Sequence, residues 1–337
     1  MRTRKLITRA FSLILGLAPS ATFAGYNFTT LAGPSGASNT HGEGISGSGQ
    51  VSGYYSDGVS GSTHGFVYSG GANGTYTTLD APQGTQGTLA FGINASGQVA
   101  GYINSGVFAA ENGFVYSGGA NGTFGAINYP SGSDTLAYGI SDSGQVVGIY
   151  GGFRGFGSQI FVYSGGANGS YTSIAAPTNA SLTNAYGINN SGQIVGGIAG
   201  SASGSHGFLY SGGANGIYTL LDDPLGQNGT GATGINNLGQ IVGSYTDASS
   251  VTHGFVYSGG ANGTYSTVDD PLGAGTFLTG INDSGQVVGY YTDLSGFSHA
   301  FVSTPASVPE PSSLLLCGMG GGVVAAIAAR RRRPKLA

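Results

Sequence analysis

One unit of about 47 residues recurs six times in this chain, and this repetition constrains the fold more than any other feature. The copies align on one glutamine, with spacings of 48, 47, 48, 47 and 46 residues, at Gln50, Gln98, Gln145, Gln193, Gln240 and Gln286. Such a period is typical of arrays in which each copy is one supersecondary unit. No 3.6-residue apolar pattern accompanies it, which excludes a helical solenoid.

Each copy predicts four short strands. In the copy spanning 89–135 they are expected at Ala90–Asn94, Gln98–Ile103, Gly113–Ser117 and Thr123–Asn128. An Asn-Gly pair precedes the fourth strand, and both residues accept the positive φ of a tight hairpin turn. The strands are apolar or aromatic almost throughout, so both faces should be covered. Evenly spaced short strands predict an all-β, six-bladed β-propeller.

The two ends of the repeat region predict how the ring closes. The sixth copy stops after three strands, at His299–Ala306, and Tyr26–Leu31 resembles the missing fourth strand. We expect this N-terminal strand to complete the last blade and so remove an exposed sheet edge. The expected blade units are 42–88, 89–135, 136–183, 184–230, 231–276 and 277–303, with 25–34 closing the last.

Composition agrees with a folded body. Glycine supplies 67 of 337 residues, a content typical of low-complexity chains, but 20 tyrosines and 16 phenylalanines can form a core when glycines sit at turns. Between residues 25 and 307, Arg154 is the only basic residue against 13 acidic ones, which gives a formal charge of −12. A body with one cation cannot neutralise a row of phosphates, so nucleic-acid binding is excluded.

The remaining basic residues frame two processing segments. Residues 1–24 predict a signal peptide, with a cationic start, a short apolar run at Ala10–Leu17 and small residues before Gly25, so signal peptidase is an expected partner. Residues 312–329 are uncharged and predict a single transmembrane helix after a linker at 304–311. A basic cytoplasmic tail at 330–337 follows, and its stop-transfer residues are Arg330, Arg331, Arg332 and Arg333.

The order of parts at the C-terminus resembles the PEP-CTERM sorting signal of Gram-negative bacteria. Its motif here is Val308, Pro309, Glu310 and Pro311, followed by the apolar helix and the arginines. The resemblance implies recognition by an exosortase-type enzyme and transient anchoring in the inner membrane. Transfer to the cell surface or to the exopolysaccharide matrix of a biofilm would follow.

A second resemblance covers residues 25–303. The third strand of four copies begins with a histidine, as in His299-Ala300-Phe301, and these units resemble the HAF repeats of extracellular bacterial proteins. That resemblance implies a surface-exposed repeat protein without an assigned reaction. The same position accepts Asn112 and Gln159, so it predicts side-chain hydrogen bonding and no metal or cofactor. The six glutamines are interpreted in the same way, and His41 lies outside this position with no expected partner.

The loops at one end of the ring form the candidate site. Strand order places eleven carboxylates there, at Glu43, Asp57, Asp80, Glu111, Asp134, Asp222, Asp223, Asp247, Asp269, Asp270 and Asp293. The candidate ligand rim consists of Arg154, Asp222, Asp223, Asp269 and Asp270. Such a rim would suit divalent cations or an exopolysaccharide.

Two classes of function stay open. The first is a non-enzymatic scaffold, adhesion or binding propeller, with no catalytic residue. The alternative is a polysaccharide hydrolase or lyase, because adjacent aspartates offer carboxylate pairs and a glycosidase needs two, about 5–10 Å apart. Asp-Asp-Pro also caps turns, and a catalytic site requires one repeat to differ, as only Arg154 clearly does.

Overall fold

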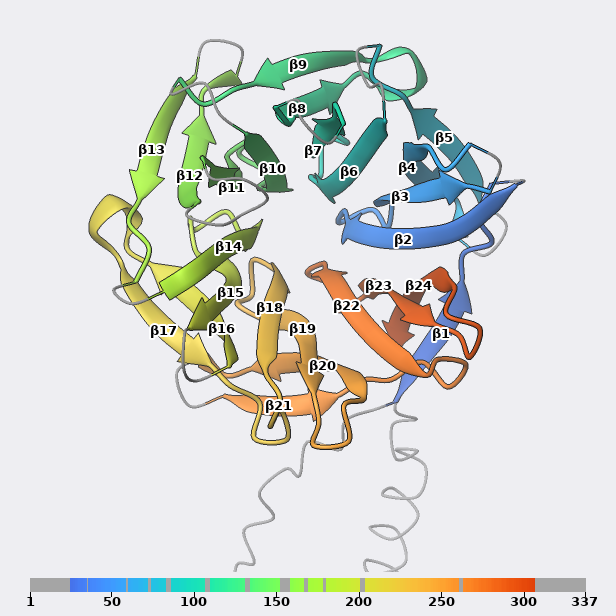
Figure 1. The fold of residues 1–337 in the computed structure, drawn as a ribbon, viewed down its shortest axis with the longest axis vertical. Helices are drawn as coiled ribbons and strands as arrows, with labels where there is room; N and C mark the ends of the chain where they lie inside the picture. Colours follow the sequence, from blue (N-terminus) through green and yellow to red (C-terminus); the bar gives the residue numbers. More distant parts are fainter. Residues whose placement is uncertain are drawn as a thin grey trace, which may run out of the picture. The chain divides into compact units, whose positions relative to one another are not determined.

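Six four-stranded antiparallel blades surround a central axis (Figure 1). Five blades run outward from the first strand to the fourth in chain order, and in the sixth the N-terminal strand of the body takes the outer position. A single parallel bridge between Thr63 and Gly87 links the first two blades into one hydrogen-bonded sheet. The structure confirms the predicted six-bladed all-β propeller, because the apolar strands are covered on both faces by the neighbouring blades.

This computed structural model describes residues 25–34, 36–58, 60–71, 74–82, 86–106, 110–130, 134–151, 158–166, 169–177, 180–200, 204–260 and 263–306. The predicted signal peptide, sorting motif, transmembrane helix and basic tail lie outside these ranges, as does Arg154. Within them, no helix is long and apolar enough to cross a membrane.

The strands of the six blades occupy equivalent positions. The inner strands are β2 (Ala37–Ile45), β6 (Gly87–Ile93), β10 (Thr135–Ile140), β14 (Ala180–Ile188), β18 (Thr230–Ile235) and β22 (Gly275–Ile281). The second strands are β3 (Val51–Asp57), β7 (Val99–Asn104), β11 (Val146–Tyr150), β15 (Ile194–Gly200), β19 (Ile241–Thr246) and β23 (Val287–Thr292). The third strands are β4 (Thr63–Ser69), β8 (Asn112–Ser117), β12 (Gln159–Ser164), β16 (Ser205–Ser211), β20 (Thr252–Ser258) and β24 (Ser298–Pro305). The outer strands are β5 (Thr75–Leu79), β9 (Thr123–Ile127), β13 (Ser170–Ile174), β17 (Ile217–Leu221), β21 (Thr264–Thr267) and β1 (Tyr26–Thr30).

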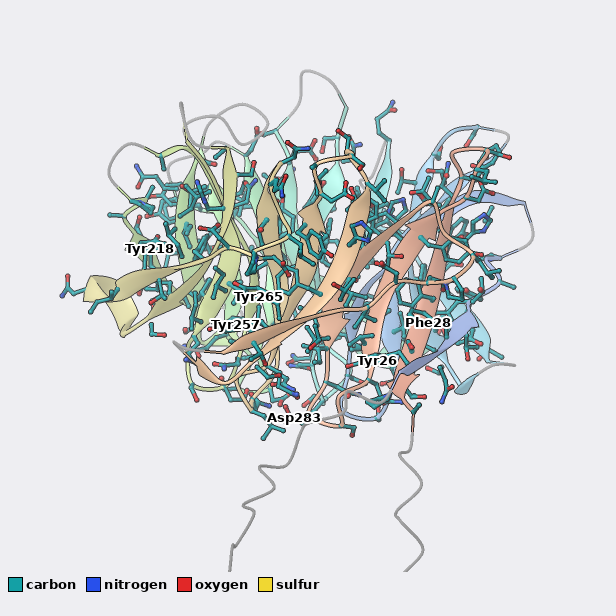
Figure 2. All side chains as sticks on the ribbon, turned by 90° about the horizontal axis from the view of Figure 1, so that it is seen from below. Tyr26, Phe28, Tyr218, Tyr257, Tyr265 and Asp283 are labelled. Atoms are coloured by element: carbon teal, nitrogen blue, oxygen red, sulfur yellow. The ribbon has the colours of Figure 1, made fainter. Side chains whose placement is uncertain are left out.

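The ring closes as predicted, through the N-terminal strand. β1 pairs antiparallel with β24, from Tyr26 opposite Pro305 to Thr30 opposite Phe301. Phe28 packs edge-on against Phe301 with ring centroids 5.1 Å apart. Figure 2 labels Tyr26 and Phe28 on this outer strand. The first strand of the body therefore holds its last blade in the ring.

One phenylalanine from each third strand forms the core of its blade, and all six are at most 1% exposed, at Phe66, Phe114, Phe161, Phe208, Phe255 and Phe301. A glycine on the second strand makes room for the ring. A Cβ on Gly101, for example, would lie 2.6 Å from the Phe114 ring and 2.2 Å from the Leu89 carbonyl oxygen. The repeated glycines of the second strands thus belong to the core.

A tyrosine holds the turn between the third and fourth strands. Tyr116 Oη donates to the carbonyl oxygen of Gly119 and accepts from the Gly122 N–H at 2.9 Å. Positive φ occurs at Gly118 and Gly119, at 107° and 65°, whereas Gly122 has φ −73°. The prediction that Asn-Gly supplies the positive φ is therefore wrong. The chain reverses on the preceding glycine pair and then enters a short 3-10 turn, Gly119–Asn121.

Candidate functional site

A β-bulge interrupts each inner strand at the same point, just before a glycine and a buried isoleucine. The antiparallel ladder between the first and second strand skips one residue there, or two in β6. The bulge residues are Glu43, Phe91, Tyr138, Tyr186, Thr233 and Thr279. A bulge re-aims the side chain it frees, and all six of these residues line one cavity on the axis.

The glycine after each bulge brings the inner strands close together. A Cβ on Gly139 would lie 2.6 Å from the carbonyl oxygen of Tyr186 in the next blade. At the point where the ring closes, a Cβ on Gly280 would lie 3.1 Å from the carbonyl oxygen of Glu43. Side chains at these positions would push the blades apart, so the glycines keep the central channel narrow.

The cavity holds about 220 Å³ and is also lined by Tyr290 from β23. Its floor is a ring of isoleucines, each 6–9% exposed, at Ile45, Ile93, Ile140, Ile188, Ile235 and Ile281. The same isoleucines border a smaller cavity of about 80 Å³, which lies among the tight turns. A hydrophobic constriction therefore separates the two cavities, and the mouth of the larger one lies toward the loop end of the ring.

A chain of aromatic rings lies along one side of this cavity, and four of its members, Phe91, Tyr138, Tyr186 and Tyr290, line it directly. We call the set the aromatic arc: Phe277, Tyr290, His41, Tyr54, Phe91, Tyr102, Tyr138 and Tyr186. Successive centroids along it lie 4.1–6.1 Å apart, and Tyr102, on the second strand of the same blade as Phe91, lies 5.5 Å from the Phe91 ring. The two threonines complete the circle, and their hydroxyls donate to backbone oxygens of the next blade. The backbone of the channel thus repeats six times, whereas its side chains are aromatic on one side and threonine on the other.

Glu43 is the only carboxylate among the described residues that line the cavity. Its side chain is 13% exposed, and burial raises its pKa to about 8. Burial also lowers the pKa of His41 to about 4. His41 Nδ1 lies 3.9 Å from Glu43 Oε1, so near neutral pH an uncharged carboxylic acid faces an uncharged imidazole.

Two predictions fail at this point. Glu43 was assigned to the loop end, but it lies within β2 on the channel axis, because the inner strand begins six residues before it. His41 was expected to have no partner, but it stacks on Tyr54 at 4.7 Å and contacts Tyr290 at 4.1 Å. A signal was present in the sequence. The position before each Gly-Ile is aromatic in three copies, threonine in two and glutamate in one, so Arg154 is not the clearest departure from the repeat.

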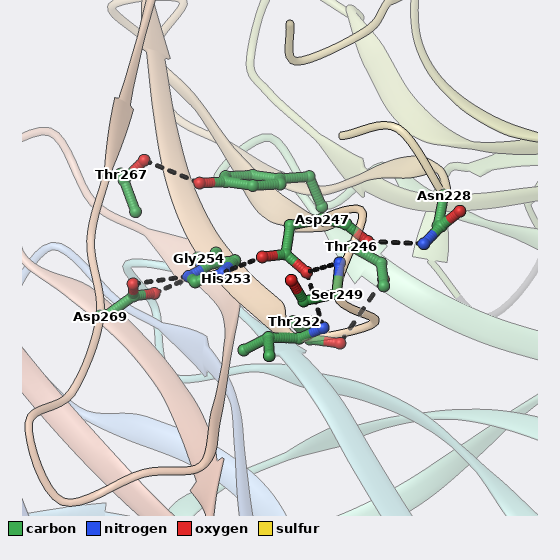
Figure 3. Close-up of polar contacts among 11 residues, drawn as sticks. Asn228, Thr246, Asp247, Ser249, Thr252, His253, Gly254, Thr267 and Asp269 are labelled. Carbon is green, nitrogen blue, oxygen red and sulfur yellow. Dashed lines mark hydrogen bonds and ion pairs between the residues drawn. The ribbon is translucent and has the colours of Figure 1, made fainter. Parts of the chain in front are cut away.

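The repeated histidines lie at the loop end, held by aspartates of the surrounding loops. His253 Nδ1 lies 2.7 Å from Asp269, and its Nε2 lies 3.6 Å from Asp247 (Figure 3). Burial lowers the pKa of His253, but the hydrogen bonds and charges of these aspartates outweigh it and raise the pKa overall. The contact with Asp269 recurs between Nδ1 of His64 and Asp80 and between Nδ1 of His206 and Asp222, each at 2.8 Å. His299 instead uses Nε2, which lies 3.0 Å from Asp293, the counterpart of Asp247. These contacts are the side-chain hydrogen bonds expected of the repeated position.

The aspartates of the candidate rim have structural contacts. Asp222 and Asp269 bind the histidines just described. Their neighbours Asp223 and Asp270 are only 5% and 2% exposed, and each accepts a backbone N–H from two residues ahead at 2.9 Å. Burial raises the pKa of both. Across the described ranges, no three His, Cys, Asp or Glu side chains converge to form a metal-binding group.

The tight-turn end carries a belt of asparagines that link one blade to the next. The Asn94 side chain donates to the Ser141 carbonyl at 3.2 Å, and Asn282 donates across the closure to the Ser46 carbonyl at 3.0 Å. Asp142 and Asp283, the latter labelled at this end in Figure 2, accept backbone N–H groups from the preceding blade. The polar groups at this end are therefore engaged in holding the ring together.

Comparison with known proteins supports the C-terminal assignment and the fold. The PEP-CTERM protein-sorting motif matches residues 307–333, and this motif implies export and sorting to the surface of a Gram-negative bacterium. The search of curated proteins found no match. Among solved structures, an arginine-to-alanine mutant of AofleA from Arthrobotrys oligospora is 13% identical, with a TM-score of 0.52 over 85% of this chain and 91% of that one. A mutant of the Aleuria aurantia lectin in complex with Fucα1-6GlcNAc is 14% identical, with a TM-score of 0.49 over 82% and 100%.

Proposed function

We propose that this protein is an exosortase-sorted component of the cell surface or exopolysaccharide matrix, and that its propeller binds a glycan in the central cavity without catalysing a reaction. The observation that carries the proposal is the aromatic arc around a cavity of about 220 Å³. Ligand sites are typically concave, largely aromatic and equipped with a few polar groups, as this cavity is.

The size and lining of the cavity suit a sugar. One water molecule occupies about 30 Å³ in the liquid, so the cavity of about 220 Å³ has the volume of about seven waters. This volume accommodates a single sugar unit or branch at a time. The apolar faces of sugar rings pack against aromatic rings, and hydroxyl groups can then reach Glu43 and the tyrosines of the arc. One carboxylate in the described lining supports binding over hydrolysis, since a glycosidase uses two.

Mutation of the aromatic arc tests the proposal. We expect Tyr138→Ala or Phe91→Ala to weaken binding to the exopolysaccharide of the host strain by about 5- to 150-fold, because loss of one aromatic stacking surface costs about 1–3 kcal/mol. Phe297→Ala is the matched control, since Phe297 is 48% exposed and lies outside the cavity lining. Wild-type binding by both arc variants in a sedimentation or calorimetric assay would reject the cavity as the site.

The sorting route is a separate part of the proposal. Signal peptidase would remove residues 1–24, the helix at 312–329 would hold the chain in the inner membrane, and the exosortase would act near Pro309-Glu310-Pro311. A chain lacking 308–337 should then fail to reach the surface while its body still binds the polysaccharide. Surface display of the truncated chain would refute this route.

The enzymatic alternative keeps one observation in its favour. Tyr102 and Tyr138 of the arc lie within electrostatic range of two carboxylates, Glu111 and Glu43. A polysaccharide hydrolase or lyase at this site would release reducing or unsaturated ends, and Glu43→Gln would abolish that release while polysaccharide binding persisted. The loop-end rim of Arg154, Asp222, Asp223, Asp269 and Asp270 remains a second proposed contact, for cations or for the polymer outside the channel.

A further inference from the structure

We infer that the central cavity selects an organic cation, an ammonium group carried by a glycan, with Glu43 as its ion partner and the aromatic arc as its cage. This inference rests on the proposed function and names the chemistry of its ligand. Two kinds of glycan carry such a group: those with unacetylated amino sugars and those with quaternary ammonium substituents.

The rings are arranged as the walls of a cage. Phe91 and Tyr138 meet at 81° and Tyr138 and Tyr186 at 71°, so neighbouring rings stand almost perpendicular around the cavity. Tyr290 from the last blade also lines the cavity with Glu43. Ring faces attract cations within about 6 Å, and quaternary ammonium groups are recognised by such aromatic cages.

The Glu43 carboxyl is available to a ligand. It lines the cavity, and among the described residues its side chain has one polar neighbour at close range, His41 Nδ1 at 3.9 Å. The titratable neighbours of Glu43 are an imidazole and phenols, which cannot replace an ionic partner. A buried carboxyl without strong hydrogen bonds is costly to retain, which supports a role with a bound cation.

The charge of the site excludes an anionic ligand. No Lys or Arg is among the described lining residues, and the body around it carries a formal charge of −12. A uronate or sulfate group would enter the cavity without a counter-charge and against this field. A cation is attracted by both the field and the ring faces.

Binding should release a proton. His41 on the same strand faces Glu43, as do five tyrosines, one on β3 and four on other blades: Tyr54, Tyr102, Tyr138, Tyr186 and Tyr290. Glu111 acts on two of them, Tyr102 and Tyr138. None of them supplies a positive charge near neutral pH. An entering ammonium would favour the carboxylate, so the Glu43 proton would leave to solvent as the ion pair forms.

Calorimetry with choline and its uncharged carbon isostere, 3,3-dimethylbutan-1-ol, tests the inference on the purified protein. We expect choline to bind at least about tenfold more tightly than the isostere, and its affinity to rise about tenfold per pH unit between pH 6 and 7.5. Titration in two buffers of different ionisation enthalpy should report a released proton. Glu43→Gln should lower choline binding by about tenfold and remove its pH dependence, while the ring faces retain a smaller preference for choline over the isostere.

The same calorimetry with glucosamine and N-acetylglucosamine, a second pair of charged and uncharged ligands, distinguishes the two kinds of glycan. A preference for glucosamine over choline assigns a primary ammonium, and the reverse assigns a quaternary one. Equal affinity of charged and uncharged members in both pairs, or an unaltered preference in Glu43→Gln, overturns the inference. If Tyr138→Ala still abolishes polysaccharide binding in that case, the proposed function stands without the cation. If Tyr138→Ala also has no effect, both are refuted.

Discussion

Glu43→Gln should remove a pH dependence from the free energy of unfolding. Burial holds the pKa of Glu43 at about 8, against its ordinary value of 4.5. Between these values the folded chain keeps a proton that the unfolded chain has released. Stability therefore falls as pH rises through this interval, because the folded state binds more protons than the unfolded state. Glutamine has no proton to release, so the variant lacks this fall.

His41 determines where the effect can be measured. Burial lowers its pKa from 6.5 to about 4, so between these values the unfolded chain binds the additional proton and stability rises with pH. Below pH 6.5 the slopes of these two residues oppose each other, and above it only Glu43 of the two contributes. At 1.36 kcal/mol per pH unit, the Glu43 contribution to stability should fall by about 2 kcal/mol from pH 6.5 to 8. Solvent screening takes little from this figure, since the side chain is 13% exposed.

Urea unfolding at pH 6.5 and 8, with the slope m held common, gives the required free energies. Wild type and His41→Gln should both lose about 2 kcal/mol more than Glu43→Gln across this interval, because His253 and the other titrating groups contribute equally to all three proteins. His41→Gln is the control, because it alters the same cavity without removing the carboxyl. Other acids contribute equally to all three proteins. Parallel pH profiles for wild type and Glu43→Gln would show that the carboxyl is ionised in the folded state, and the reasoning would fail.

Three further predictions concern the ring itself. Phe114→Ala should destabilise the protein by about 3–5 kcal/mol in chemical unfolding, because it empties the centre of one blade; a loss below 1 kcal/mol would contradict that packing role. Gly139→Ala should lower the melting temperature, since its Cβ would lie 2.6 Å from a backbone oxygen, whereas Gly125→Ala, whose nearest atom is 3.5 Å away, should be tolerated; equal melting of the two would refute close blade contact at the bulge. His253→Gln should cost more stability at pH 5 than at pH 8, because hydrogen bonding and charge raise the His253 pKa and that stability is lost as pH rises through it; a cost independent of pH would exclude the charged form.

The local sequence of each repeat is sufficient to predict most of the fold. A glutamine and the apolar strands that follow it recur six times, and each copy can satisfy its hydrogen bonds as four short strands. The partial sixth copy and Tyr26–Leu31 complete one another, so closure could be predicted as well. The position of the positive φ could not, because Gly118-Gly119 and Asn121-Gly122 are both competent and the tyrosine that selects the first pair comes from the preceding strand.

The sorting signal could likewise be predicted from the sequence, because the motif is defined by the linear order of Pro-Glu-Pro, an apolar segment and arginines. The motif matched at 307–333 confirms it. Charge partition along the chain also required no structure. It excluded nucleic acid as a partner before any strand was placed.

The candidate site in the central cavity could not be predicted from the sequence pattern. Glu43 was counted with the loop carboxylates, because a pattern of strands does not show which residue a bulge will displace. The register of β2 against β3 turns this side chain onto the axis, and six separate inner strands then bring it beside rings from four other blades. The sequence alone determined the number of blades, their closure and the sorting motif, since these depend on local pattern. Only the tertiary structure decided the chemistry of the channel, since contacts between distant repeats create the burial that changes the charge state of Glu43.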